Sequence, residues 1–184
     1  MKPLSIRFCG FGGQGIVLSA VILGTAAVTK RGLYAVQTQS YGSEARGGQC
    51  QSELIIAEDP ITSPATQEKD IMVAMFQTAL DTYIPSLKKE GTLIVDPDMV
   101  NDLHGWDDRV LKVPATETAI KLGNRLCANM VVLGYFQGAT QFVSRDDLVA
   151  TMKEHLAEKF HDLNTRAIDA GIELAEGVSV KIEE

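Results

Sequence analysis

A glycine-rich segment near the start of the chain, GFGGQG at residues 10–15, constrains the fold more than any other feature. Residues 4–9 before it read as a short buried strand, and residues 14–30 after it form a helical segment that is apolar on all sides. Arg31 and Gly32 are a plausible helix stop, and residues 33–38 suit a second strand. The order strand, glycine loop, helix, strand within about 30 residues predicts a βαβ unit.

The rest of the chain continues this alternation. Further strands are expected at residues 50–57, 70–76, 92–95 and 110–113, and helices at 78–89, 115–122, 126–141 and 145–175, the last with a break near His161. Residues 39–49 read as a loop, and residues 177–184 could form an edge strand or an arm onto a partner. We therefore expect an α/β fold, with residues 1–184 forming a single three-layer α/β/α domain around a mostly parallel, Rossmann-like sheet.

Charge and hydropathy exclude several partners. The net charge of −7 gives no general reason to expect binding to nucleic acid or to an anionic membrane, so any anion site must be local. The N-terminus lacks a signal-peptide pattern, and the longest apolar run, residues 16–28, is interrupted and too short to span a bilayer. A cytoplasmic protein without a membrane partner is the expectation.

The cysteines and histidines form no recognisable metal motif. Cys9, Cys50 and Cys127 stand singly in apolar segments without a C-x-x-C pair, so the chain cannot hold a four-cysteine iron–sulfur cluster by itself. The three thiols are expected to be reduced and buried. His155 and His161 fall in a charged helical stretch that suits a solvated surface. The sequence therefore offers no metal site and no catalytic group of its own.

The glycine loop itself allows several interpretations. A strand–loop–helix junction directs backbone N–H groups and the helix dipole at one spot, which suits an anion. A dinucleotide site also needs an acidic residue about 20 residues further on, at the end of the second strand. Residues 33–39 contain no acid, and the nearest is Glu44 in the following loop. A P-loop is disfavoured too, because no Lys-Ser or Lys-Thr follows the glycines. A tight turn that only permits helix–sheet packing remains open.

A second loop, YGSEARGG at residues 41–48, follows the second strand. In a parallel sheet it emerges at the same carboxyl edge as GFGGQG. Its three glycines permit close approach of another chain or ligand, and Glu44 and Arg46 supply opposite charges. These two residues form either a surface ion pair of little energetic value or part of a convergent site or subunit contact.

Together the two loops carry a family resemblance. GFGGQG at 10–15, QSYGSEARGG at 39–48 and SELII at 52–56, with GNRLCANMVVLG at 123–134, resemble the γ subunit of the 2-oxoacid:ferredoxin (acceptor) oxidoreductases. The likeness runs in order over nearly the whole chain. Ser43 and Arg125 stand where relatives often carry proline.

The resemblance implies a non-catalytic subunit of a larger enzyme. Complexes of this family convert a 2-oxoacid, coenzyme A and oxidised ferredoxin into acyl-CoA, CO2 and reduced ferredoxin. Thiamine diphosphate with Mg2+ is assigned to the α and β chains and the iron–sulfur clusters to the β and δ chains. The γ chain would bind none of these cofactors alone, would assemble with α, β and δ subunits, and would flank the active site.

Specific residues follow from this interpretation. Candidate contacts to coenzyme A combine the N–H groups of the glycine loop with nearby cations and amides: Gly10, Gly12, Gly13, Gln14, Gly15, Arg46, Asn124, Arg125 and Asn129. For Asn129 a satisfied core amide, and for Arg125 a solvated cation, are the alternatives. Candidate subunit contacts lie in the second loop: Tyr41, Gly42, Glu44, Arg46, Gly47 and Gly48.

The substrate is expected to be 2-oxoglutarate, with pyruvate, branched-chain 2-oxoacids and indolepyruvate left open. Two rival functions remain. One is a freestanding nucleotide-binding Rossmann-like protein, against which the missing ribose acid argues. The other is a pure assembly scaffold that contacts no ligand.

Overall fold

A computed structural model describes residues 2–42 and 48–182 of the chain. The strands are β1 (Leu4–Phe11), β2 (Tyr34–Tyr41), β3 (Gln49–Ala57), β4 (Lys69–Ala74), β5 (Leu87–Val95) and β6 (Val110–Lys112). The helices are α1 (Ile16–Arg31), α2 (Gln77–Tyr83), α3 (Ala115–Lys121), α4 (Ala128–Thr140), α5 (Arg145–His155) and α6 (His161–Leu174), with short 3-10 turns η1 (Ile84–Ser86), η2 (Asp107–Arg109), η3 (Arg125–Cys127) and η4 (Glu158–Phe160). This order confirms the expected α/β class.

The six strands form one sheet in the order β2-β3-β1-β4-β5-β6. Strands β1, β4, β5 and β6 pair in parallel, whereas β3 is antiparallel to both of its neighbours, β1 and β2. Since β1 and β2 each oppose β3, they run the same way, and the sheet is mostly parallel as expected. The first βαβ unit differs from the simple expectation, because β3 inserts between β1 and β2.

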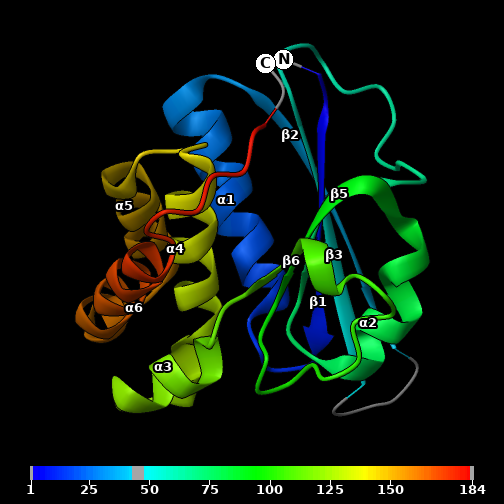
Figure 1. The fold of residues 1–184 in the computed structure, drawn as a ribbon. Helices are drawn as coiled ribbons and strands as arrows, with labels where there is room; N and C mark the ends of the chain where they lie inside the picture. Colours follow the sequence, from blue (N-terminus) through cyan, green and yellow to red (C-terminus); the bar gives the residue numbers. More distant parts are fainter. Residues whose placement is uncertain (1, 43–47, 183–184) are drawn as a thin grey trace.

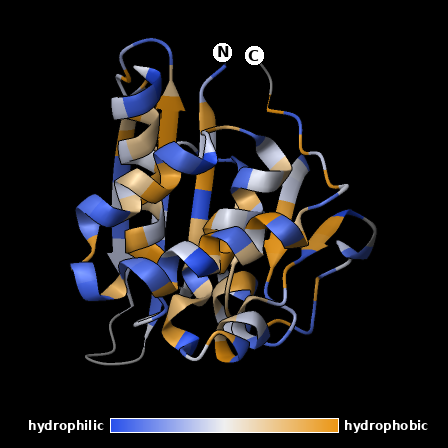
Figure 2. Ribbon diagram, turned by 90° about the vertical axis from the view of Figure 1, so that its left-hand side faces the viewer, coloured by the Kyte–Doolittle hydropathy of each residue, from blue (hydrophilic) through white to orange (hydrophobic). Residues whose placement is uncertain are grey.

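The helices cover the two faces of the sheet unequally (Figure 1). Helices α1, α3, α4, α5 and α6 lie on one face, and α2 lies on the other. Along β1 the side chains alternate: Ile6 and Phe8 enter the core under the larger helix layer, while Cys9 packs with the residues under α2. Seen from the side of the larger layer, the strands behind it carry mostly hydrophobic residues (Figure 2).

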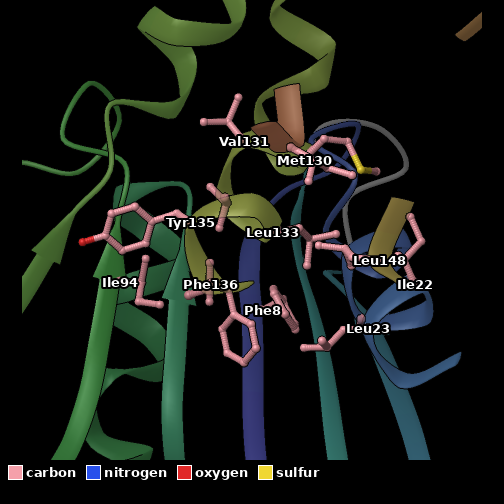
Figure 3. Packing of buried hydrophobic residues seen from close by; sticks show 14 of the residues in the cluster. Phe8, Ile22, Leu23, Ile94, Met130, Val131, Leu133, Tyr135, Phe136 and Leu148 are labelled. Carbon is pink, nitrogen blue, oxygen red and sulfur yellow. The ribbon is translucent and has the colours of Figure 1, made fainter. Parts of the chain in front are cut away.

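The core of the larger layer is continuous from the sheet to the outer helices. Figure 3 shows Phe136 of α4 beside Phe8 of β1, with Leu23 of α1 and Leu148 of α5 nearby. Phe8, Phe136 and Leu23 are almost completely buried. Burial of such side chains contributes about 1.5–3 kcal/mol each to folding. This apolar layer therefore supplies most of the burial that holds the helices on the sheet.

Two glycines allow α4 and α6 to touch backbone to backbone. A Cβ added to Gly134 would lie 2.0 Å from the carbonyl oxygen of Ile168, and one added to Gly171 would lie 2.0 Å from that of Val131. Real Cβ atoms do not approach an oxygen so closely. The two helices can pack at this distance only because both positions lack a side chain.

Three expectations for secondary structure differ from the structure. The predicted loop at 39–49 is shorter, because β2 extends to Tyr41 and β3 begins at Gln49. The helix predicted at 78–89 ends at Tyr83, and from Leu87 the chain belongs to β5. Pro85 lies in the intervening 3-10 turn and has no N–H with which to continue the helix hydrogen bonds. The tail at 177–184 was predicted as an edge strand or an arm onto a partner, and it forms no strand within the described residues. Val178, Val180 and Ile182 pack against the core, and the N–H of Val180 donates to Ala139 O at 2.8 Å.

One helix end was predicted correctly. Helix α1 ends at Gly32, which adopts a left-handed conformation with φ 68°. The structure also shows that Ser144 caps α5 by accepting a hydrogen bond from the N–H of Asp147. Within the described residues, none of the helices combines the length and apolarity that crossing a membrane requires.

Candidate functional site

The glycine loop is a turn held by one side chain. Gln14 accepts a hydrogen bond from the N–H of Phe11 at 2.7 Å and donates through Nε2 to the carbonyl of Met75, after β4, at 2.8 Å. A Cβ on Gly10 would lie 2.5 Å from Oε1 of Gln14. Gly13 has φ +97°, a conformation that side chains disfavour. The glycines therefore make room for Gln14, which ties the loop to the neighbouring strand.

Gly15 and Asn129 connect this loop to α4. Gly15 is the N-cap of α1 with φ 73°, and no side chain caps the helix. A Cβ on Gly15 would lie 2.3 Å from Nδ2 of Asn129, which donates to Gly15 O at 3.3 Å. Asn129 is only 3% exposed. Of the two interpretations of Asn129, the geometry favours the core amide that braces the loop.

An open cavity of about 290 Å3 lies beside this turn, outside the carboxyl ends of β1, β4 and β5. Ligands of open α/β sheets bind in this position. The cavity is lined mainly by apolar side chains, with a few polar groups: Phe11, Gly13, Gln14, Met75, Phe76, Met99, Thr116, Arg125, Leu126 and Ala128. Gly13, Gln14 and Arg125 are the sequence-predicted residues that reach it.

Arg125 is the cation of the cavity wall. It lies in η3, is exposed, and its Nη2 contacts Sδ of Met99 at 3.2 Å. Within the described ranges its guanidinium forms no ion pair. Its neighbour Asn124 caps the same turn by accepting a hydrogen bond from the N–H of Leu126 at 2.9 Å. Arg125 therefore presents a charge to the cavity, while Asn124 has a local structural role.

A buried carboxylate that sequence reasoning missed supports the opposite wall. Asp96, at the end of β5, is 1% exposed and accepts hydrogen bonds from the N–H and the hydroxyl of Thr116 at 2.8 and 2.6 Å. Burial raises the pKa of Asp96. Thr116 lines the cavity, so Asp96 positions this wall at the start of α3. An acidic residue directly after a buried strand was the available signal.

The two glycine-containing loops meet, as the sequence predicts. The N–H of Gly12 donates to Gly48 O at 3.1 Å, and that of Gly42 donates to Gln49 O at 2.7 Å. Tyr41 is 62% exposed at the end of β2. Glu44, Arg46 and Gly47 lie outside the described residues. Because β3 lies between β1 and β2, the end of β2 is one strand away from the glycine loop. A dinucleotide site needs the glycine loop and the residue after the second strand close together, so this sheet order separates its two parts.

Apolar side chains also gather at the rim of the cavity. Leu126 is 73% exposed, and Phe11 is 38% exposed with its ring 5.4 Å from that of Phe76. Exposed apolar groups beside a pocket are typical of surfaces that another molecule covers.

The cysteines of this chain do not fit a cluster or a metal. Burial raises the pKa of Cys9 to about 12, and it also raises the pKa values of Cys50 and Cys127. A metal ligand must be a thiolate, which these environments disfavour. The described residues contain no group of three or more His, Cys, Asp or Glu side chains placed to hold a metal ion.

Comparisons with known proteins place nearly the whole chain in one protein family. Residues 5–174 match the family of pyruvate ferredoxin/flavodoxin oxidoreductases. The chain is 45% identical over 176 residues to the 2-oxoglutarate synthase subunit KorC of Methanothermobacter marburgensis, covering 92% of this chain and 95% of that one.

Solved structures agree with this assignment. The keto/oxoacid ferredoxin oxidoreductase γ subunit of Geobacter sulfurreducens superimposes with a TM-score of 0.84 at 34% identity, covering 98% of this chain and all of that one. The 2-oxoglutarate:ferredoxin oxidoreductase of Magnetococcus marinus shares the fold, with a TM-score of 0.86 at 22% identity over 97% of this chain and 32% of that one. The resemblance inferred from the loops and the helix motif is confirmed.

Proposed function

The chain belongs to the pyruvate ferredoxin/flavodoxin oxidoreductase family, and we propose on this premise that it is the γ subunit of a 2-oxoglutarate:ferredoxin oxidoreductase. The assembled enzyme converts 2-oxoglutarate, coenzyme A and oxidised ferredoxin into succinyl-CoA, CO2 and reduced ferredoxin. The observation that carries the proposal is the 45% identity to a 2-oxoglutarate synthase subunit over nearly the full length of both chains.

In this proposal, residues 1–184 act as one cytoplasmic domain that assembles with α, β and δ chains. Thiamine diphosphate, Mg2+ and iron–sulfur clusters reside in those other chains. The three buried, neutral thiols of this chain support that division, since they are unsuited to hold a cluster.

The cavity at the carboxyl edge is the proposed docking place for part of coenzyme A. The phosphates of coenzyme A need cations and N–H donors, and the cavity combines Arg125 with the loop at Gly13 and Gln14. Its apolar remainder suits the less polar portions of the molecule. Because the cavity is open, neighbouring subunits would complete the site.

Subunit contact is the proposed role of the second loop and the apolar rim. Tyr41 and Leu126 expose most of their surface next to the paired loops and the cavity. Covering them with another chain would remove apolar area from water at about 25 cal/mol per Å2. Arg46, which lies outside the described residues, remains a candidate for either contact.

Arg125→Ala in the assembled complex tests the docking role. Removal of one charge-assisted phosphate contact, worth about 1.5–3 kcal/mol, should raise the apparent KM for coenzyme A by about tenfold or more. The KM for 2-oxoglutarate should change little. Steady-state assays with a viologen acceptor measure both constants, and Arg46→Ala is read in the same way.

The matched control is Arg166→Ala. Arg166 is an exposed arginine on α6 that pairs with Asp162 one helical turn away, outside the cavity lining. An unchanged KM for coenzyme A in both Arg125→Ala and Arg46→Ala, with intact assembly, would leave the scaffold function as the better description. Faster turnover of pyruvate than of 2-oxoglutarate by the co-purified complex would contradict the substrate assignment.

A further inference from the structure

Strand β2 forms one edge of the sheet, and its outer side has no strand partner in the described part of the chain. Its eight residues, YAVQTQSY, contain no charged residue and no proline. Proteins usually guard long edge strands with charges, prolines or bulges, because unpaired N–H and C=O groups attract another strand. At about 3.4 Å per residue, β2 presents an unguarded edge about 27 Å long.

A groove of about 270 Å3 runs beside this edge, between α1 and β2. A Cβ on Gly24 of α1 would lie 2.9 Å from Cδ1 of Leu54, so the missing side chain lets the helix approach the sheet there. Val28 and Ala35 form other parts of the wall, and none of the residues that line the groove is charged. The hollow is therefore uncharged and mainly apolar, and it lies next to an unpaired strand.

Tyr41, at the far end of the same strand, is a side chain that such a groove can accept. Residues alternate between faces along β2, and Gln37 pairs with Leu54 of the core under α1, so Ala35, Gln37 and Tyr41 share the α1 face. Tyr41 is 62% exposed on that face. One strand thus carries an exposed aromatic ring near one end and an apolar groove near the other.

We propose that a second copy of this chain pairs with β2, strand against strand, around a two-fold axis. In an antiparallel pair, residues directly opposite each other point to the same face of the sheet. The two-fold axis must therefore pass between two copies of the same residue. If Thr38 faces Thr38 of the second copy, Tyr41 of one copy lies opposite Ala35 of the other, because each is three residues from Thr38. Each tyrosine then enters the groove of the other copy, and the contact is made twice.

Local charge permits a second copy as the occupant. Each chain carries a net charge of −7, which opposes self-association in general, but neither the strand nor the groove lining contains a charged residue. The paired edges therefore bring no like charges together. The contact is limited to two eight-residue strands and their grooves, so the dimer should dissociate on dilution. This inference does not rest on the proposed function, but both assign Tyr41 to a contact with another chain, which is here a second copy.

Analytical ultracentrifugation of the purified full chain gives the first test. The wild type should show a monomer–dimer equilibrium, and Thr38→Lys should abolish the dimer, because two ammonium groups would face each other across the axis. Tyr41→Ala should raise the dissociation constant by about tenfold, as expected for a lost aromatic contact of about 1.4 kcal/mol. The matched control, Ile120→Lys, adds the same charge at an exposed position on α3 and should leave the dimer intact.

Cysteine cross-linking tests the register. Thr38→Cys should form an intermolecular disulfide under mild oxidation, since the two thiols meet at the axis. Ser40→Cys, on the same exposed face of the strand, lies opposite Val36 of the second copy and should not. The proposal is overturned by a wild-type chain that stays monomeric, by Thr38→Lys and Tyr41→Ala that both dimerise as the wild type does, or by Ser40→Cys that cross-links as readily as Thr38→Cys.

Discussion

On the face of the sheet covered by five helices, Ile6 and Phe8 of β1 pack among apolar side chains, whereas Arg7 of the same strand enters an ion network on the opposite face. Arg7 and Lys69 both pair with Glu53 of β3, and Lys69 is 1% exposed. The guanidinium of Arg7 also lies 4.7 Å from the centroid of the Tyr83 ring.

The contrast shows that burial is achieved by two physical means. Apolar packing depends on shape, and at Gly134 and Gly171 it depends on the absence of any side chain. The ion network depends on every charge having its partner, because an unpaired charge away from water is strongly destabilising. The two faces should therefore fail in response to different mutations.

Gly171→Ala should have the largest effect, on the helix-covered face. The added methyl would lie 2.0 Å from the carbonyl oxygen of Val131, so α4 and α6 must separate. We expect a loss of about 4 kcal/mol or more in the free energy of unfolding, measured by urea denaturation. Gly→Ala in an unhindered helix stabilises by about 1 kcal/mol, so helix propensity would act in the opposite direction.

Gly138→Ala on α4 is the graded control for that experiment. Its added Cβ would meet Cβ of Ala175 at 2.8 Å and the carbonyl oxygen of Ile172 at 3.1 Å, a milder overlap. The expected loss is about 1–2 kcal/mol. Equal losses in the two variants would show that direct backbone contact is not what limits the packing of these helices.

Glu53→Gln should have the next largest effect, on the other face. The substitution preserves shape but leaves Arg7 and Lys69 without their common carboxylate, and we expect a loss of about 3 kcal/mol. Burial raises the pKa of Glu53, but the hydrogen bonds and charges of Lys69 and Arg7 outweigh it, so the net pKa is lowered. The stabilisation from Glu53 is thus present above its unfolded-state pKa and disappears as the pH falls through the lowered value.

Urea denaturation of wild type and Glu53→Gln across acidic pH measures this loss. The difference in stability between the two proteins should vanish at low pH, where Glu53 is protonated. Lys88→Gln is the control, because it breaks the more exposed ion pair between Lys88 and Asp70. Its loss in the free energy of unfolding at neutral pH should be smaller. A difference for Glu53→Gln that persists unchanged into acid would contradict an electrostatic origin.

The smallest effect is expected from His104→Asn, at the surface. His104 Nε2 lies 2.8 Å from Oδ1 of Asp81, and this hydrogen bond raises the pKa of His104. The pair stabilises the fold below the unfolded-state pKa of histidine, and that contribution is lost as the pH rises through the raised folded-state value. Both groups are exposed, so salt should screen the interaction.

An NMR titration of His104 in wild type and in Asp81→Asn checks the pair directly. The histidine pKa should fall in the variant, and added salt should reduce the difference between the two proteins. A histidine pKa that is the same in both would mean that Asp81 does not hold His104 in solution. Compared with Glu53→Gln, this result would show how much burial strengthens similar ion-pair chemistry.

Local patterns predicted the framework of the site correctly. The apolar strand, the glycines and the buried helix of residues 4–31 specify a strand–turn–helix junction through short-range hydrogen bonds and periodicity. The family resemblance rested on motifs of the same kind. Residues 87–89 were predicted as the end of a helix but belong to β5, because pairing of β5 with β4 overrides their local preference.

The sequence alone determined the order of elements, the α/β class and the family, because these depend on residues close together in the chain. Tertiary structure decided that β3 separates β1 from β2, that Asn129 braces Gly15, and that Asp96 supports Thr116. It also decided that Arg125 reaches the cavity whereas Asn124 caps a turn. Apart from the local Asn124 cap, these contacts join residues distant in sequence, and their geometry follows from strand register and helix packing, which no local pattern specifies.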